Sequence, residues 1–305
     1  MSMRTIGIRK GNARVKNYIL AKLDSLNKED LNIVFEDYNK SDLLYIKCSL
    51  KEGFLAGIKN NKISNDLIKN IATILSDVII NNYEYLLIKK VIDDYYIYIT
   101  EAEKEQIFKF VDRIIKRDDN NYSGSIYKQL RRNMIKEIIF DYLKTEDLII
   151  LDGFINFRLN DYKKELYLVV DRAFKEFIAQ KEYDEFIKLL KYFVEIQDSK
   201  VDVIHIVADK KYGYILLDDK KRKISIENDK DLLNESSEKG LNNDDTLISS
   251  LISIAPKKIY IHNISEFSNK ELIKTIQNVF SDRMEICSNC DICGFVALKS
   301  KNKLN

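Results

Sequence analysis

One segment decides the fold of this chain: LDGFINFRLNDYKKELYLVVDRAFKEFIAQKEYDEFIKLLKYFVEIQ, residues 151–197. It joins an aromatic-rich beginning, DGFINFRLNDY, to two successive apolar patterns with helical spacing. Each pattern places its apolar side chains on one face of a helix. The first pattern comprises Leu166, Val169, Val170, Ala173, Phe174, Phe177 and Ile178, and the second comprises Tyr183, Phe186, Ile187, Leu190, Phe193 and Val194. We expect two helices that bend near residues 180–184, because two helices fit a compact domain better than one long helix.

The chain changes character on either side of this segment, and three domains are predicted. Residues 1–58 form a small α/β element with the order strand, helix, strand, strand, predicted at 5–8, 11–26, 32–38 and 43–48. Residues 59–199 are almost wholly helical. The Thr100–Glu103 pair is a capping box that marks the beginning of one of these helices.

Residues 200–305 form a C-terminal α/β module. Strands are predicted at 201–208, 212–217, 223–226, 258–262 and 283–287, and a polar loop at 227–245. A helix follows the loop and extends through residue 254, and a second helix is predicted from Ser268, with Glu271 completing a capping box, to Phe280. The order strand, helix, strand predicts a parallel βαβ unit. The expected fold class is therefore α+β, with a central helical bundle between the two α/β parts.

The composition favours a soluble, cytoplasmic protein. Fifty basic residues against 48 acidic ones give a net charge of +2, which provides no overall attraction to nucleic acid or anionic lipid. The most apolar helical stretch, 67–99, is interrupted by seven charged residues, so we expect a core helix and no membrane span: Lys69, Asp77, Glu84, Lys89, Lys90, Asp93 and Asp94. The charged beginning of the chain does not resemble a signal peptide.

The sharpest chemical feature is the sequence ICSNCDIC, which contains Cys287, Cys290 and Cys293. This spacing brings three soft sulfur ligands together, as a zinc ion or an iron–sulfur cluster requires. The fourth ligand could come from Cys48, His205, His262 or an outside molecule. His262 is the better histidine, because it ends a predicted strand where a parallel sheet presents its carboxyl edge. His205 alternates with valines and is expected to be a half-buried, hydrogen-bonded residue.

The simpler interpretation of the three cysteines is that they are free thiols in a reducing cytosol. Under that interpretation the protein has no cofactor. Metal binding by Cys287, Cys290, Cys293 and His262 is the alternative.

Other candidate sites are weaker. Four basic residues, Lys128, Arg131, Arg132 and Lys136, share one side of a predicted helix and could contact phosphate. No nucleic-acid-binding motif accompanies them, so nucleic acid is not an expected partner. The sequence also contains no phosphate-binding glycine motif, no GxSxG and no HExxH. We therefore expect a protein that is not an enzyme.

Several long stretches resemble the YtxC-like family of sporulation proteins. They are GFINFRLNDY, LVVDRAF and KEYDEFIKLLKYFVEIQ, followed by VIHIV and ISSLISIAPKKIYIH. The resemblance is densest over about 150–265 and transfers no catalytic residue. It implies a cytoplasmic protein of endospore-forming bacteria. Two functions follow as expectations: a non-enzymatic scaffold or regulator that binds an unknown protein partner during sporulation, or a metal-linked redox or sensor protein built on the cysteine cluster.

Overall fold

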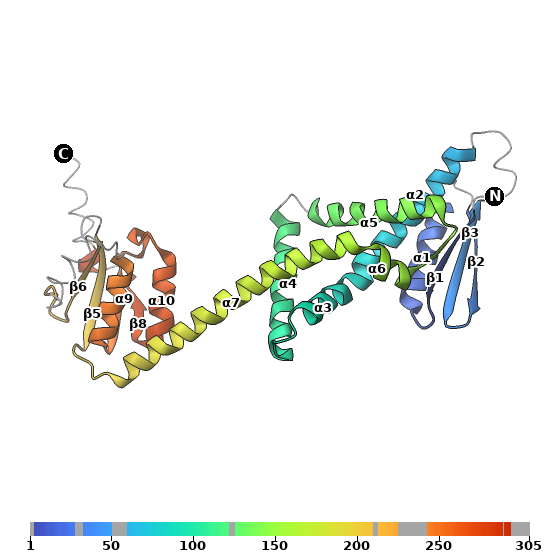
Figure 1. Cartoon of the computed structure of the whole chain (residues 1–305). Coiled ribbons are helices and arrows are strands. Elements are labelled where there is room, and N and C mark those ends of the chain that lie inside the picture. Colours follow the sequence, from blue (N-terminus) through green and yellow to red (C-terminus); the bar gives the residue numbers. More distant parts are fainter. Residues whose placement is uncertain are drawn as a thin grey trace, which may run out of the picture. The chain divides into compact units, whose positions relative to one another are not determined.

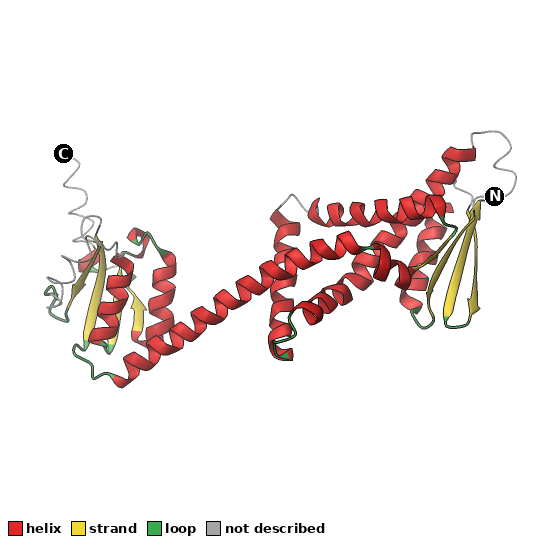
Figure 2. Cartoon of the chain, in the orientation of Figure 1, coloured by secondary structure: helices red, strands yellow, loops and turns green. Residues whose placement is uncertain are grey.

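A computed structural model of the chain describes residues 3–27, 33–50, 60–121, 126–209, 213–224, 243–288 and 290–293. The chain divides into two compact units, Met1–Ala179 and Gln180–Asn305. In the described residues each unit contains one four-stranded sheet and its own hydrophobic core. Figures 1 and 2 show the two sheets. The α+β class and the central helical region predicted from the sequence are confirmed.

The first unit begins with the predicted order of strand, helix, strand, strand. The elements are β1 (Met3–Arg9), α1 (Ala13–Asn27), β2 (Ile33–Lys40) and β3 (Leu43–Leu50). The sheet order is β2-β3-β1-β4, with β3 antiparallel to both β1 and β2. Alternate residues of β3, including Ile46 and Cys48, point into the core, and α1 buries Val15, Ile19 and Leu23. This sheet and the helices that follow it share one core, so they belong to the same unit.

A fourth strand, β4 (Leu148–Ile150), pairs in parallel with β1 and was not predicted. Its three residues are too few to show an alternating pattern. They become a strand because β1, far away in the sequence, offers them hydrogen-bonding partners.

The first unit contains the helical body that the sequence predicts. This body comprises α2 (Asn60–Val78), α3 (Glu84–Tyr95), α4 (Glu101–Asn121), α5 (Ile126–Thr145) and α6 (Leu151–Arg158). A π-helical turn, η1 (Ile79–Tyr83), connects α2 directly to α3. By length and composition the stretch Asn65–Tyr95 could cross a membrane, but 61% of its most apolar window is buried. A core helix of a soluble protein has the same character.

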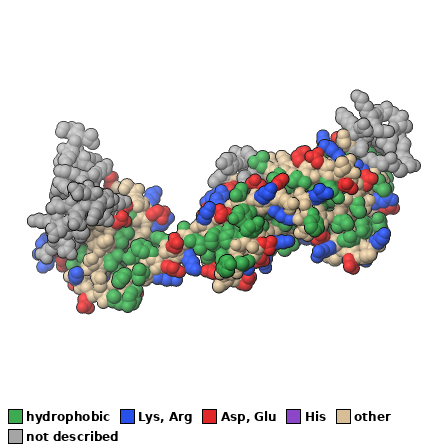
Figure 3. Space-filling view, in the orientation of Figure 1, with side chains coloured by type: hydrophobic (Ala, Val, Ile, Leu, Met, Phe, Trp, Pro, Cys, Tyr) green, Lys and Arg blue, Asp and Glu red, His purple; other side chains and the backbone are tan. Residues whose placement is uncertain are grey.

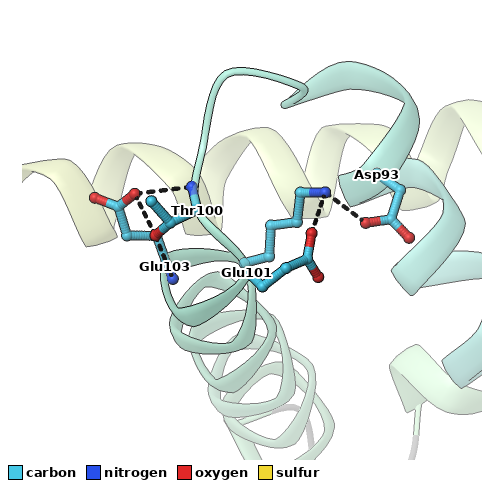
Figure 4. A network of polar contacts seen from close by, with 5 residues as sticks. Asp93, Thr100, Glu101 and Glu103 are labelled. Carbon is cyan, nitrogen blue, oxygen red and sulfur yellow. Dashed lines mark hydrogen bonds and ion pairs between the residues drawn. The ribbon is translucent and has the colours of Figure 1, made fainter.

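The capping box at the beginning of α4 has the predicted contacts (Figure 4). The Glu103 carboxylate accepts hydrogen bonds from the Thr100 backbone N–H at 3.1 Å and from the Thr100 hydroxyl at 2.8 Å. The Glu103 N–H donates to Thr100 Oγ1 at 3.3 Å. Lys104 binds Asp93 of α3 at 3.0 Å and Glu101 at 2.8 Å, which connects the end of one helix to the beginning of the next.

The predicted bend near residues 180–184 is wrong, because α7 (Asn160–Ile196) is one continuous helix. Its sequence contains no Gly or Pro that would interrupt the backbone hydrogen bonds. Its two apolar patterns are buried in different cores. Leu166, Val170 and Phe177 belong to the first core, and Ile187, Leu190 and Val194 belong to the second.

The second unit contains β5 (Val203–Asp209), β6 (Gly213–Leu217), α9 (Asn243–Ile254), β7 (Lys258–His262), α10 (Lys270–Phe280) and β8 (Met284–Ile286). The sheet order is β6-β5-β7-β8; β7 is parallel to both β5 and β8, and β6 is antiparallel to β5. The predicted βαβ unit is therefore confirmed as β7-α10-β8. The amphipathic helix α10 buries Leu272, Ile273, Ile276, Val279 and Phe280.

Three local predictions in the second unit differ from the structure or fall outside it. The N-cap of α10 is Asn269 and not Ser268, because the Asn269 side chain accepts a hydrogen bond from the Glu271 N–H at 3.0 Å. Of the predicted strand at 223–226, Lys223 forms a bridge with Leu217, and residues 225 and 226 lie outside the described residues. Most of the predicted loop at 227–245 lies outside the described residues.

A buried polar group lies in the first core beside the π-helical turn. Glu84, the first residue of α3, is 8% exposed and accepts a hydrogen bond from Arg131 Nε of α5 at 3.1 Å. The hydroxyl of Tyr162, which is fully buried, donates to the same carboxylate oxygen. Burial and the neighbouring Glu84 charge raise the pKa of Tyr162, so this hydroxyl keeps its proton. The three side chains connect α3, α5 and α7.

The replacement Arg131→Ala is expected to lower the free energy of unfolding by about 3–5 kcal/mol, because it leaves the Glu84 carboxylate buried without its cation. Urea unfolding followed by circular dichroism measures the change. Lys128→Ala, an exposed site on the same helix, is the control and should stay within about 0.5 kcal/mol of the wild type. Equal stability of the two variants would contradict a structural role for the buried pair.

Candidate metal centre

The carboxyl edge of the second sheet brings His262 and Cys287 together. His262 is the last residue of β7, a central strand, and Cys287 follows the last residue of β8. Because β7 and β8 are parallel, their carboxyl ends meet at the same edge. The Cys287 N–H extends this pairing by donating to the Ile261 carbonyl oxygen at 2.9 Å. The backbone thus fixes the first two donors.

The chain after β8 turns back and adds two more sulfur atoms. Cys290 precedes a single helical turn at 291–293 that ends the described part of the chain. This turn carries Cys293, which is buried, next to the partly buried Cys290. The Sγ atoms of Cys290 and Cys293 lie 3.4 Å and 3.5 Å from His262 Nδ1. Both sulfurs therefore face the same ring nitrogen.

Four of the separations between the donor atoms are close to those of a tetrahedral site. Cys293 Sγ lies 4.0 Å from Cys290 Sγ and 3.9 Å from Cys287 Sγ, and all four donors lie within 4.8 Å of one another. A tetrahedral zinc ion with ordinary bond lengths would separate two sulfurs by about 3.8 Å and a sulfur from a nitrogen by about 3.5 Å. The observed distances therefore fit a single ion at the centre of the group.

The electrostatic surroundings keep the donors in the forms that bind metal. Burial, the neighbouring His205 and the charge of Lys221 lower the pKa of His262, so its imidazole is neutral at neutral pH. Burial alone would raise the pKa of Cys290, but hydrogen bonds from the backbone N–H groups of Cys293 and Ile292 and from the Cys287 thiol more than offset it. The net lowering of this pKa favours the thiolate, which is the metal-binding form.

His205 lies directly behind the candidate ligand. Its Nδ1 is 2.9 Å from Nε2 of His262, and its ring stacks on Tyr260 with centroids 5.3 Å apart and an interplanar angle of 18°. Its prediction as a half-buried, hydrogen-bonded residue is confirmed. The sequence does not show that the bonding partner is the other histidine of the chain. That contact requires the β5–β7 pairing, in which His205 lies opposite Tyr260.

The other candidate residues lie elsewhere. Cys48 is buried in the core of the first unit, and this burial raises the pKa of its thiol to about 12. Among the basic residues of α5, Arg131 is buried against Glu84 and Arg132 forms an ion pair with Asp77 of α2. Intramolecular partners therefore account for these two charges, and nucleic-acid binding stays an unfavoured expectation.

The fold and this cluster define a two-unit α+β protein with a Cys₃His group of metal-ligand geometry at a parallel sheet edge. The family model described as the YtxC-like family matches residues 69–285, which is more than half of the chain. The chain therefore belongs to the YtxC-like family. The match includes β7 and ends within β8, before Cys287. Family membership therefore does not bear on the three cysteines.

A relative from Bacillus subtilis (strain 168), the uncharacterized protein YtxC, is 25% identical over 200 residues. The aligned region covers 64% of this chain and 68% of the relative. No solved structure matches the chain.

The stability of the metal-free protein should depend on pH through the histidine pair. Burial lowers the pKa of His205 and of His262 in the folded protein, so each takes up a proton more readily when unfolded. As far as these two histidines are concerned, the folded protein is therefore most stable above about pH 6.5, the ordinary pKa of histidine. It loses stability as the pH falls and protonation favours the unfolded chain. The free energy of unfolding should decrease between about pH 7.5 and 5.5.

Urea unfolding of metal-free protein across this pH range measures the slope. The double variant His205→Asn/His262→Asn should show a flatter dependence, because neither replacement titrates. An unchanged slope in the double variant would assign the pH dependence to other groups.

Proposed function

We propose that this protein binds one zinc ion through His262, Cys287, Cys290 and Cys293, and that it acts as a non-enzymatic, cytoplasmic regulator or scaffold during sporulation. The convergence of four donor atoms within 4.8 Å carries the metal-binding part of the proposal. The sporulation setting is supported by the resemblance to the YtxC-like family described in the sequence analysis, to which family membership adds.

The geometry favours a single ion over an iron–sulfur cluster. In a [4Fe–4S] cluster each cysteine binds a different iron atom, so the ligand sulfurs lie farther apart than they do around a single ion. Here the three sulfurs and the imidazole nitrogen are arranged around one point. Three thiolates with one imidazole form a ligand set found in structural zinc sites.

The same geometry supports a role that is not catalytic. Zinc in enzymes keeps one coordination position open for water or substrate, whereas structural sites use four protein ligands. The four donors of this cluster would fill a tetrahedral shell. Zinc also undergoes no redox change, so a sensing function would depend on gain or loss of the ion or on chemistry of the thiolates.

Metal analysis of the full chain, purified anaerobically without an affinity-metal step, tests the proposal directly. We expect one zinc per chain and no stoichiometric iron, with zinc lost in Cys290→Ser and Cys293→Ser. Cys48→Ala is the matched control and should keep its zinc, because Cys48 lies in the other core. Protein that contains neither metal would end the proposal, and stoichiometric iron would replace zinc with an iron site, which the amount of acid-labile sulfide would identify as a cluster or a single ion.

Protein binding is supported by apolar side chains at the surface. Figure 3 shows such side chains on both units. In the second unit, α7 buries Ile187 and Leu190 but also exposes Phe186, Leu189 and Ile196, with exposed fractions of 51%, 51% and 60%. Large exposed apolar groups on one helix are typical of a surface that binds another protein. Such a surface needs no catalytic residues.

Capture of the tagged full chain from sporulating cells tests this second part. Leu189→Ser should reduce recovery of any specific partner, because it removes apolar contact area at the centre of the exposed group. Lys188→Ser, at the neighbouring exposed position, is the control and should leave recovery unchanged. Equal recovery with both variants would exclude this face of α7, and recovery at background level with the wild type would count against a binding role.

A further inference from the structure

We infer that His205 is a positioning residue for the metal site, which holds the His262 ring so that Nδ1 faces the three sulfurs. The inference rests on the proposed zinc function and adds to it a residue that is not itself a ligand. It begins from the 2.9 Å contact between His205 Nδ1 and His262 Nε2. His205 therefore contacts the side of the imidazole that faces away from the cysteines.

Metal coordination determines where the protons of both rings lie. A neutral imidazole carries one proton, and the nitrogen that binds metal must offer its lone pair. Since His262 Nδ1 faces the sulfurs of Cys290 and Cys293, the His262 proton must be on Nε2. That N–H then donates to His205 Nδ1, which accepts, and the proton of His205 is on its own Nε2.

The fold holds His205 in this orientation. The parallel pairing of β5 with β7 places His205 opposite Tyr260, two residues before His262. The His205 ring stacks on Tyr260, which restricts its rotation. His262 is only 2% exposed, so water has little access to satisfy its Nε2–H in place of His205. Without the acceptor, a buried N–H donor would lose its partner or the ring would turn.

The contact is of the kind that metal-binding histidines make through the ring nitrogen that does not bind the metal. Histidine ligands of metals ordinarily donate their other N–H to a carboxylate, a carbonyl or water, and this bond fixes the tautomer and the ring orientation. Here a second histidine takes the place of those acceptors. Loss of such a partner typically lowers metal affinity about 10–100-fold.

Two variants of the full chain separate acceptance of this hydrogen bond from packing. His205→Phe keeps a ring that can stack on Tyr260 but accepts no hydrogen bond. His205→Asn loses the ring, but its side-chain oxygen can occupy nearly the position of His205 Nδ1. We expect the zinc dissociation constant to rise about 10–100-fold in His205→Phe and to stay near the wild-type value in His205→Asn. Competition with a chromogenic zinc chelator measures both constants.

Nuclear magnetic resonance provides a readout that a packing role would not change. In ¹⁵N-labelled, zinc-bound protein we expect His262 to carry its proton on Nε2, with a slowly exchanging, downfield proton signal in the wild type and in His205→Asn. The signal should be lost in His205→Phe. Equal zinc affinity of all three proteins, or equal weakening in both variants, would overturn the positioning role while leaving zinc binding intact. Wild-type protein that binds no zinc would overturn the proposed function and this inference together.

Discussion

The parallel pairing of β7 with β8 is the interaction on which the candidate metal centre depends. Opposed residues of the two strands, such as Ile261 and Ile286, lie in register, and the backbone bond from Cys287 to Ile261 continues that register past the end of β8. Parallel neighbours require a crossover connection, and α10 provides it. The apolar face of α10 buries five side chains, so the crossover also contributes to the second core. The packing of α10 thus determines where the two candidate ligands His262 and Cys287 meet.

The close approach of three sulfur atoms has an electrostatic cost without a cation. Sulfur separations of 3.9 Å and 4.0 Å would place ionised thiolates against one another. A divalent cation bound at the centre, as proposed above, would remove this repulsion, and its binding would then be coupled to the arrangement of the donors around it. Under the proposed function, the positions of Cys290 and Cys293 would depend on metal binding as well as on apolar burial. The sheet beneath them contains its own apolar side chains and does not share this dependence.

Sequence patterns predicted most of the helices and strands because those patterns are local. The Thr100 capping box and the strand that ends at His262 are examples, and both are present in the structure. The elements that differed depend on distant partners or on tertiary packing. Strand β4 exists because β1 is beside it. The two apolar patterns of α7 enter separate cores, so the helix, which has no Gly or Pro, is not bent to bring them into one core.

The candidate site was predictable to a similar extent. The spacing of Cys287, Cys290 and Cys293 predicts a metal-binding segment near the C-terminus. The position of His262 at the carboxyl end of a predicted strand indicates that it is the better of the two histidines as a ligand. The contact between His205 and His262 was not predictable. It depends on which strands are neighbours and on their register, and the local sequence VIHIV predicts neither.

The continuity of α7 has a consequence for how the chain folds. Forming the first turn of a helix is the unfavourable step, and each further turn is added at little cost. Turns held by the first core supply a nucleus from which residues 180–196 can extend as helix, so this part of the second core need not begin its helix independently.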